Sequence, residues 1–237
     1  MKLSAPIFRL KKQARALSRA EGIPLNQALD RVAQQEGFER WSLLSSKLAL
    51  TPTSSQILDQ FEPGDLVLLA ARPQQGKTTL GLSLVAEAIR QHRASAFFTL
   101  FHTDEEVRDR LSEFGVDVSA ESDKLLIDTS DTISAPHLIN QLADTPSGAI
   151  VVVDYLQVLD QRRDTPVLST QVEMLKSFAQ RSGVVLILIS QVSRTFDPTA
   201  KQVPDLEDVH LPNPVDLRVF SHTCFLNDGV IQLDKAA

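Results

Sequence analysis

Polar residues at three places in this 237-residue chain could together bind a nucleoside triphosphate. Gly76-Lys77-Thr78-Thr79 has the residue order of a phosphate-binding loop, whose backbone N–H groups surround phosphate oxygens. Lys77 would reach the β- and γ-phosphates, and the Thr78 hydroxyl would take one position on Mg²⁺. Asp154 ends an apolar run and fits the other Mg²⁺ role, directly or through water. Gln191 could hydrogen-bond the γ-phosphate or its attacking water, although an ordinary turn residue also fits that position.

A strand, a loop and a helix must position the lysine, and the sequence has them in this order. The apolar run 66–70 predicts the strand, and apolar residues at helical spacing follow Thr79. Ala71 stands where the general motif has its first glycine, and its Cβ disfavours a positive φ, so the loop is expected to close in another way. A chance Gly-Lys-Thr at a helix start is the alternative. The predicted nucleotide-binding residues are Ala71, Arg72, Pro73, Gln74, Gln75, Gly76, Lys77, Thr78, Thr79 and Asp154.

Strand and helix patterns alternate through the rest of the chain. Further strands are predicted over 96–100, 125–128, 149–154, 184–190, 217–226 and 230–233. Helices are predicted over 134–142, over 169–181 and after Thr103, which with Glu106 forms a capping box. This alternation predicts an α/β fold with a mainly parallel sheet and helices on both faces. Ligands bind beyond the carboxyl ends of such strands, so the P-loop, the segment after Leu100, Asp154 and Gln191 are expected to form one site.

Composition excludes several classes of protein. The formal net charge is −6, hydrophobic residues make up 43%, and no apolar run reaches the ~18 residues of a membrane helix. The basic N-terminus lacks the apolar core of a signal peptide. Cys224 is the single cysteine, which excludes an internal disulfide and agrees with a cytoplasmic location. The five histidines show no metal-binding spacing.

The first fifty residues differ from the rest in charge. Residues 1–50 have a net charge of +5 and residues 51–237 a net charge of −11. Three short amphipathic helices are predicted, over 5–20, from Leu25 to Gly37, and over 41–48 with Trp41 in their core. We therefore expect a basic helical segment at 1–50, a linker at 51–56 and a nucleotide-binding domain at 57–237. The basic first helix could contact nucleic acid or a protein partner, or it could be a solvated face.

Several motifs together resemble the DnaB-type replicative helicases, within the RecA-like ATPases. Residues 71–79 resemble the A-R-P-x-x-G-K-T-[ST] loop of that family, including its alanine, and residues 154–157 match its D-Y-L-Q segment. Ser190-Gln191 with Arg194 is similar to S-Q-x-x-R, and residues 97–100 with Glu105 and Arg110 are similar to F-F-S-L-E-M…E…R. Asp205-Leu206 and Asp216 loosely match later elements. The similarity covers about 57–233 and implies a RecA-like fold, ATP and Mg²⁺, ring assembly and single-stranded DNA in a central channel.

The sequence departs from the family pattern at three places. Phe101 occupies the position of the family's catalytic glutamate, so general-base assistance is expected to be lost. Residues 230–237 contain only Lys235 as a cation, so no arginine finger is expected there. The family's N-terminal helical collar is replaced by the basic segment 1–50.

Two loops after predicted strands are candidates for DNA contact. Arg162 and Arg163 follow the D-Y-L-Q segment, and Arg194 follows the strand that ends at Gln191. Solvated loop charges are the alternative. The sequence therefore predicts an ATP- and Mg²⁺-binding, DNA-associated ATPase with Lys77 and Gln191 as catalytic residues and weak or impaired hydrolysis. The second hypothesis is a nucleotide-binding adaptor that does not hydrolyse ATP and engages a protein partner, or a second copy, through residues 1–50.

Overall fold

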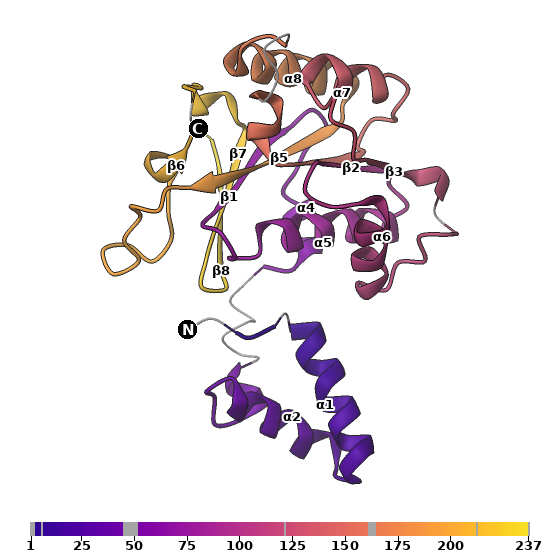
Figure 1. Cartoon of the computed structure of the whole chain (residues 1–237), viewed down its shortest axis with the longest axis vertical. Helices are drawn as coiled ribbons and strands as arrows, with labels where there is room; N and C mark the ends of the chain where they lie inside the picture. Colours follow the sequence, from indigo (N-terminus) through magenta and orange to yellow (C-terminus); the bar gives the residue numbers. More distant parts are fainter. Residues whose placement is uncertain are drawn as a thin grey trace. The chain divides into compact units, whose positions relative to one another are not determined.

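The computed structural model describes residues 3–5, 7–44, 52–120, 122–160, 165–211 and 213–236. The chain divides into two compact units, one of residues 1–52 with 228–230 and one of residues 53–227 with 231–237 (Figure 1). Each unit has its own hydrophobic core. We call the first the helical unit and the second the sheet unit. The boundaries expected from the sequence, at residues 50 and 56, remain a prediction.

The helical unit is built on α1 (Ile7–Glu21) and α2 (Leu25–Gln35). Apolar residues at helical spacing bury one face of each helix, and Trp41 packs against this core as expected from the sequence. Gly22 and Gly37 follow the two helices with φ of 65° and 81°, a backbone conformation that suits glycine. Residues 41–44 are helical, and the rest of the predicted third helix lies outside the described residues. The buried residues of this core are Leu10, Ala14, Ala28, Val32, Ala33 and Leu44.

An eight-stranded sheet forms the centre of the sheet unit, in the order β3-β2-β4-β5-β1-β7-β8 with β6 paired to β5. The pairs β2–β3, β2–β4, β4–β5, β1–β5 and β1–β7 are parallel, and β5–β6 is antiparallel. The strands are β1 (Leu66–Ala71), β2 (Ser95–Thr99), β3 (Leu125–Asp128), β4 (Ile150–Asp154), β5 (Val185–Val192), β6 (Val209–His210), β7 (His222–Asn227) and β8 (Val230–Lys235).

Helices cover both faces of the sheet (Figure 1). Alternate residues of β1 point to opposite faces, so Leu68 joins the core under α7 and α8 while Leu69 joins the core under α5 and α6. The fold is therefore the expected α/β arrangement, a mainly parallel sheet with helices on both faces. The α-helices are α4 (Ser54–Leu58), α5 (Lys77–Arg90), α6 (Asp104–Glu113), α7 (Ala135–Gln141) and α8 (Leu168–Ser182). Short 3-10 helices cover Ser122–Lys124, Leu156–Asp160, Leu206–Asp208 and Leu217–Val219.

Local structure differs from the sequence-based expectation at three places. The predicted strand 217–226 starts only at His222, because the Asp216 carboxylate accepts a hydrogen bond from the Arg218 N–H and closes a 3-10 turn. The two-residue strand β6 was not expected. Part of the expected linker 51–56 lies in α4, where Thr53 and Gln56 form a capping box.

Candidate functional site

The carboxyl ends of β1, β2, β4 and β5 meet at one edge of the sheet. Because these strands are parallel, Thr99 is paired with Asp154, and Ala71 with Gln191. Strand β5 lies between β1 and β4, so Gln191, near the carboxyl end of β5, belongs to the strand between the P-loop strand and Asp154. Asp154 and Gln191 therefore lie at neighbouring strand ends, and Lys77 begins the helix after the loop that follows β1.

The phosphate loop closes without a glycine at its first position. Ala71 remains in β1, and the positive φ values fall later in the loop, on Gln74 (62°) and Gly76 (91°). The Gln75 N–H donates a 3.3 Å hydrogen bond to the Arg72 carbonyl, which tightens the turn. Helix α5 begins at Lys77, directly after Gly76, so its free N–H groups lie at the loop. This local geometry explains how alanine can replace glycine at position 71.

Thr78 and Asp154 are in direct contact at this edge. The Thr78 hydroxyl donates a 2.8 Å hydrogen bond to an Asp154 carboxylate oxygen, and Asp154 is only 3% exposed. Burial raises the pKa of Asp154, and the Thr78 hydrogen bond is the largest effect that opposes this rise. Burial lowers the pKa of Lys77, and the nearby Asp154 charge opposes that change. A half-buried ammonium and a buried carboxylate thus lie close together.

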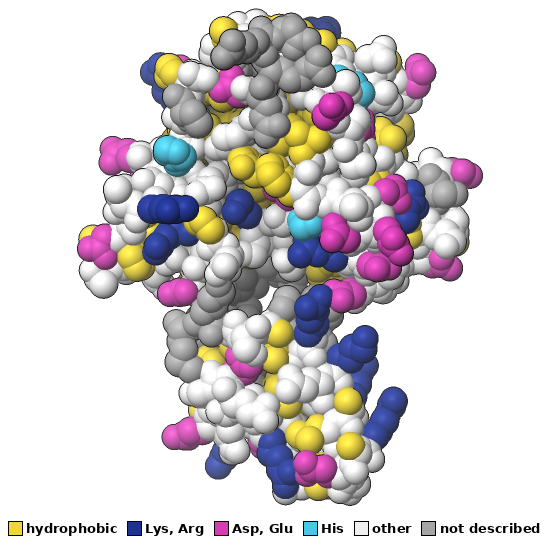
Figure 2. All heavy atoms as spheres, viewed as in Figure 1, with side chains coloured by type: hydrophobic (Ala, Val, Ile, Leu, Met, Phe, Trp, Pro, Cys, Tyr) yellow, Lys and Arg dark blue, Asp and Glu magenta, His cyan; other side chains and the backbone are white. Residues whose placement is uncertain are grey.

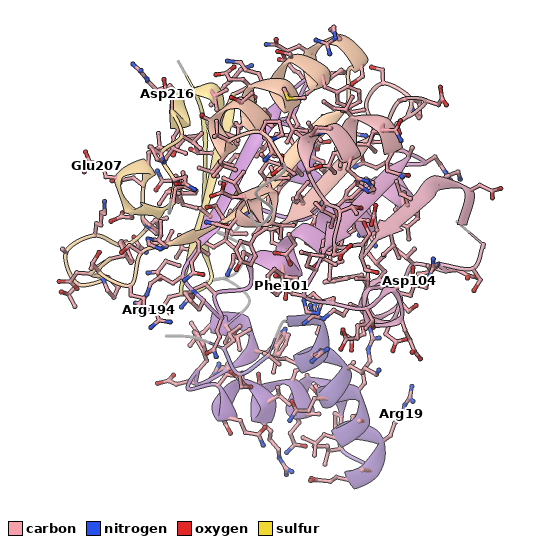
Figure 3. The ribbon with its side chains drawn as sticks, turned by 45° about the horizontal axis from the view of Figure 1, so that its top comes forward. Arg19, Phe101, Asp104, Arg194, Glu207 and Asp216 are labelled. Carbon is pink, nitrogen blue, oxygen red and sulfur yellow. The ribbon has the colours of Figure 1, made fainter. Side chains whose placement is uncertain are left out.

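Phe101 occupies the corner where β2 leaves the sheet. Its ring stacks on Tyr155, the neighbour of Asp154, with centroids 4.9 Å apart and an interplanar angle of 15°. The Phe101 N–H donates a 3.1 Å hydrogen bond to the buried Thr99 hydroxyl, which fixes the turn. Phe101 is 49% exposed, and Figure 3 shows it beside the start of α6. The apolar ring of Phe101 therefore packs on Tyr155, the residue that follows the buried Asp154.

The acidic residues after Phe101 are engaged elsewhere. Glu106 accepts a 2.9 Å hydrogen bond from the Thr103 N–H in the predicted capping box, and Asp104 pairs with Arg108. Glu105 is exposed on the same helix. Neither Asp104 nor Glu106 is therefore directed at Asp154 in place of the missing glutamate.

Two residues near Asp154, His102 and Arg110, were not among the predicted site residues. The charges of His102 and Arg110 both oppose the rise in the Asp154 pKa, and Arg110 Nη1 lies 3.3 Å from His102 Nε2. His102 directly follows Phe101, so its place after the strand end is the sequence signal that could have indicated it. Arg110 matched the arginine of the family pattern but carried no assigned role. Arg110 therefore adds a positive charge near Asp154 besides that of Lys77.

Gln157 connects the segment after β4 to strands β5 and β6. Its Nε2 donates a 2.9 Å hydrogen bond to the His210 carbonyl on β6 and a weaker 3.4 Å contact to the buried Ser190 hydroxyl. Gln157 Oε1 is buried without a hydrogen-bond partner among the described residues. This amide fixes the chain after Asp154 against β5, beside Gln191, and its carbonyl remains an available acceptor.

The predicted DNA-contacting residues have different outcomes. Arg162 and Arg163 lie outside the described residues. Arg194 is exposed on the loop after β5 (Figure 3). Lys201, the other cation of that loop, pairs with Asp205 and Asp208 at 2.6 and 2.7 Å. The loop therefore presents less positive charge than its sequence suggests.

The described part of the chain has no metal-binding cluster of three or more ligands, no reactive thiol and no helix that could span a membrane. No group of three or more His, Cys, Asp or Glu side chains is placed to hold a metal ion there. Cys224 is fully buried, and burial raises its pKa to about 12, so the thiol stays protonated. Among the described residues, no helix has the length and apolarity to span a bilayer.

Solved structures share this architecture. A DnaB-like replicative helicase, solved in a study of its interactions with primase, superposes with a TM-score of 0.61 at 15% identity, over 97% of this chain and 70% of that one. A separately solved ATPase domain gives 0.56 at 18% identity, over 73% of this chain and 74% of that one. A KaiC-like protein from Pyrococcus horikoshii gives 0.52 at 15% identity, over 73% and 80%. The fold is therefore RecA-like.

The family follows from the sequence match. The DnaB-like helicase C terminal domain matches residues 53–146 and 109–212, so the chain belongs to this family. The replicative DNA helicase DnaB of Mycoplasma genitalium is 24% identical over 81% of this chain and 51% of its own length. The corresponding protein of Synechocystis sp. is 27% identical over 86% of this chain and 27% of its own length. The chain thus spans about half, or less, of the length of these relatives.

Proposed function

We propose that the sheet unit is an ATP-binding, DNA-associated P-loop ATPase of DnaB type whose hydrolysis is slow. The observation that carries this proposal is the 2.8 Å hydrogen bond between the Thr78 hydroxyl and Asp154, next to Lys77 at a shared strand edge. In this proposal Lys77 contacts the β- and γ-phosphates, and Gln191 hydrogen-bonds the γ-phosphate. The Arg194 side chain is the described candidate for contact with single-stranded DNA.

The residues present fit a magnesium–nucleotide complex. Asp154 is a hard oxygen ligand held beside the Thr78 hydroxyl, and its burial makes a compensating positive charge favourable. At Gly76, a Cβ would meet nothing within 4 Å, so the space over the loop is open to phosphate oxygens. Thr78 and Asp154 would hold Mg²⁺, which neutralises charge on the β- and γ-phosphate oxygens when bound.

Slow hydrolysis is part of the proposal because of Phe101. A phenyl ring cannot accept a proton, whereas a positioned general base contributes about 10²–10⁴-fold. The stack on Tyr155 holds this ring beside Asp154, and the acids of α6 make other contacts. Nucleotide binding is thus expected with little of the water activation that a carboxylate would provide.

The direct test is titration of a fluorescent ATP analogue with and without Mg²⁺. Wild-type protein should bind at least tenfold more tightly than Lys77→Ala, and Mg²⁺ should strengthen the binding. Arg218→Ala is the matched control, since Arg218 is 88% exposed and pairs only with Asp216 among the described residues. Wild-type binding no tighter than that of Lys77→Ala would defeat the proposal.

A second candidate function is a nucleotide-binding adaptor that does not hydrolyse ATP. The observation that favours it is also the Phe101–Tyr155 stack, because it occupies the catalytic position with an apolar group. Such an adaptor would engage a partner protein, or a second copy of this chain, through residues 1–50. Steady-state phosphate release separates the two candidates. Turnover above the Lys77→Ala background, with or without single-stranded DNA, would exclude the adaptor.

A further inference from the structure

Helix α1 has a row of positively charged side chains that take no part in the hydrophobic core of the helical unit. Lys11, Lys12, Arg15 and Arg19 are all exposed, and their spacing places them within an arc of about 100° around the helix. Leu10 and Ala14 on another face are fully buried. Figure 2 shows dark-blue side chains along this unit, and Arg19 points away from the helix in Figure 3. We call these four residues the α1 basic stripe.

The charges of the stripe have no counterions within the described structure. No described residue forms a hydrogen bond or ion pair with any of the four side chains, whereas three of the acidic residues of the unit have other partners. Glu21 pairs with Arg31, Glu36 accepts a 2.6 Å hydrogen bond from the Ser4 N–H, and Asp30 accepts one of 2.8 Å from the Trp41 N–H. Glu21, Glu36 and Asp30 are therefore engaged by other groups of the unit rather than by the stripe.

The arrangement is unfavourable without an external anion. Lys11 and Arg15, and then Arg15 and Arg19, are like-charged at i,i+4, and each such pair destabilises a helix by about 0.2–0.5 kcal/mol. The stripe extends over roughly 12 Å of helix, at a rise of ~1.5 Å per residue. A duplex presents about one phosphate charge per 1.7 Å of its axis, so it offers several phosphates over that length.

Among the side chains of this unit that the structure describes, no exposed aromatic ring accompanies the stripe. Single-strand sites combine positive charge with exposed aromatic platforms, but Phe38 and Trp41 pack against the hydrophobic core of the unit. In the sheet unit, Lys201 is already paired with two aspartates. We propose that the α1 basic stripe binds the phosphodiester backbone of double-stranded DNA, without base specificity. This site is separate from the nucleotide site and goes beyond the proposed ATPase.

The test uses the full chain and fluorescein-labelled duplex and single-stranded 30-mers of mixed sequence, without nucleotide. Anisotropy titrations at several NaCl concentrations give the slope of log affinity against log salt. Four phosphate contacts predict a slope of about −3.6 for the duplex, which is a loss of roughly 100-fold between 50 and 200 mM salt. Changing the stripe to glutamine (Lys11→Gln, Lys12→Gln, Arg15→Gln, Arg19→Gln) should remove about 3–4 units of this slope.

A matched variant changes the net charge by the same amount at other exposed positions. Arg40→Gln, Arg181→Gln, Arg218→Gln and Lys235→Gln should leave most of the slope intact. Far-ultraviolet circular dichroism and ATP-analogue affinity should match wild type in the stripe variant, which separates DNA binding from folding and from the nucleotide site. Lys77→Ala should keep the full duplex slope whether or not it binds nucleotide.

Several results would overturn the proposal. An unchanged salt slope in the stripe variant would show that α1 does not contact DNA. An equal loss of slope in the matched variant would show that net charge alone explains the effect. A stripe-dependent loss of affinity that is larger for the single strand than for the duplex would also contradict the proposal. Sedimentation showing stripe-dependent self-association, with no affinity for either oligonucleotide, would indicate that a second copy of the chain is the partner.

Discussion

The ring of Phe101 lies stacked on the ring of Tyr155, with centroids 4.9 Å apart, one residue from the buried Asp154. The stack joins the end of β2 to the end of β4, two strands that are also paired through Thr99 and Asp154. It therefore places an apolar group where the family pattern has a carboxylate. The proposed slow hydrolysis is therefore compatible with the observed contact between Thr78 and Asp154 beside Lys77.

Replacing Phe101 by glutamate should raise the rate of ATP hydrolysis. A carboxylate at this position can accept a proton from the attacking water, and we expect phosphate release to increase about 100-fold, the lower end of the range for general-base catalysis. Phe101→Gln is the control, because it removes the stack on Tyr155 without adding a base. Equal rates for the two variants would show that the stack, rather than the missing base, limits turnover.

Removing the charge of Asp154 should have opposite effects on binding and on stability. Burial raises the pKa of Asp154, so at pH 7 its ionised form destabilises the protein without nucleotide. Asp154→Asn keeps an acceptor for the Thr78 hydroxyl and should raise the free energy of unfolding by about 0.5–2 kcal/mol. The same change should abolish the effect of Mg²⁺ on ATP-analogue affinity.

Urea unfolding and fluorescence titration measure these two effects on the same protein. Thr78→Val is the companion variant, because it leaves the carboxylate charged while removing its hydrogen-bond donor. We expect Thr78→Val to lower both stability and Mg²⁺-dependent binding. An Asp154→Asn protein that is less stable than wild type and keeps its response to Mg²⁺ would contradict the assigned role.

The sequence predicted the long elements of this fold well. Apolar runs gave the four strands that end at the site to within one or two residues, because buried parallel strands have continuous apolar sequences. The capping box of Thr103 and Glu106 was confirmed as well. Strand β6 was missed because two residues carry no periodicity, and it depends on pairing with Gln191 and Val192.

The candidate site was predictable where local motifs specify it and less so where distant residues meet. Lys77 and Thr78 follow from the loop sequence, and Asp154 from its apolar strand. His102 and Gln157 act through contacts with Arg110 and with the β6 carbonyl of His210, which depend on how separate segments fold together. No short sequence pattern encodes these contacts, so single-sequence reasoning could not assign them a role.

The buried His222 should make the sheet unit less stable in mild acid. His222 is 2% exposed, and burial lowers its pKa, with the nearby Lys235 acting in the same direction and Asp65 and Glu62 opposing. The folded state therefore binds a proton less readily than the unfolded state, whose histidine pKa is about 6.5. Stability is fully present above that value and falls as the pH drops toward the folded pKa, by about 1.4 kcal/mol for each unit of pKa difference.

Urea unfolding of wild type and His222→Asn between pH 7.5 and 5 tests this pH dependence. The variant cannot titrate in this range, so its unfolding free energy should change less with pH than that of wild type. His92→Asn is the matched control, since His92 is exposed. Identical pH profiles for wild type and His222→Asn would show that the histidine has the same pKa in both states.

Gly81 should be essential for the close packing of α5 on the sheet. A Cβ at this position would lie 3.0 Å from Ile189 Cδ1 and 3.1 Å from Val152 Cγ1, and both of these side chains are fully buried. Alanine favours the helix by about 1 kcal/mol over glycine, but overpacking of a buried core typically costs about 1–3 kcal/mol. We therefore expect Gly81→Ala to lower the free energy of unfolding by about 0.5–2 kcal/mol.

The same substitution should weaken nucleotide binding, because a displaced α5 moves Lys77 and Thr78 at its start away from Asp154 on β4. The double variant Gly81→Ala with Ile189→Val removes the closest methyl group and should recover part of both losses. A double-mutant cycle of unfolding free energies measures this coupling, which should exceed about 0.5 kcal/mol for residues in contact. Additive losses would place the limiting contact elsewhere, and a Gly81→Ala protein as stable as wild type would show that the helix can shift without cost.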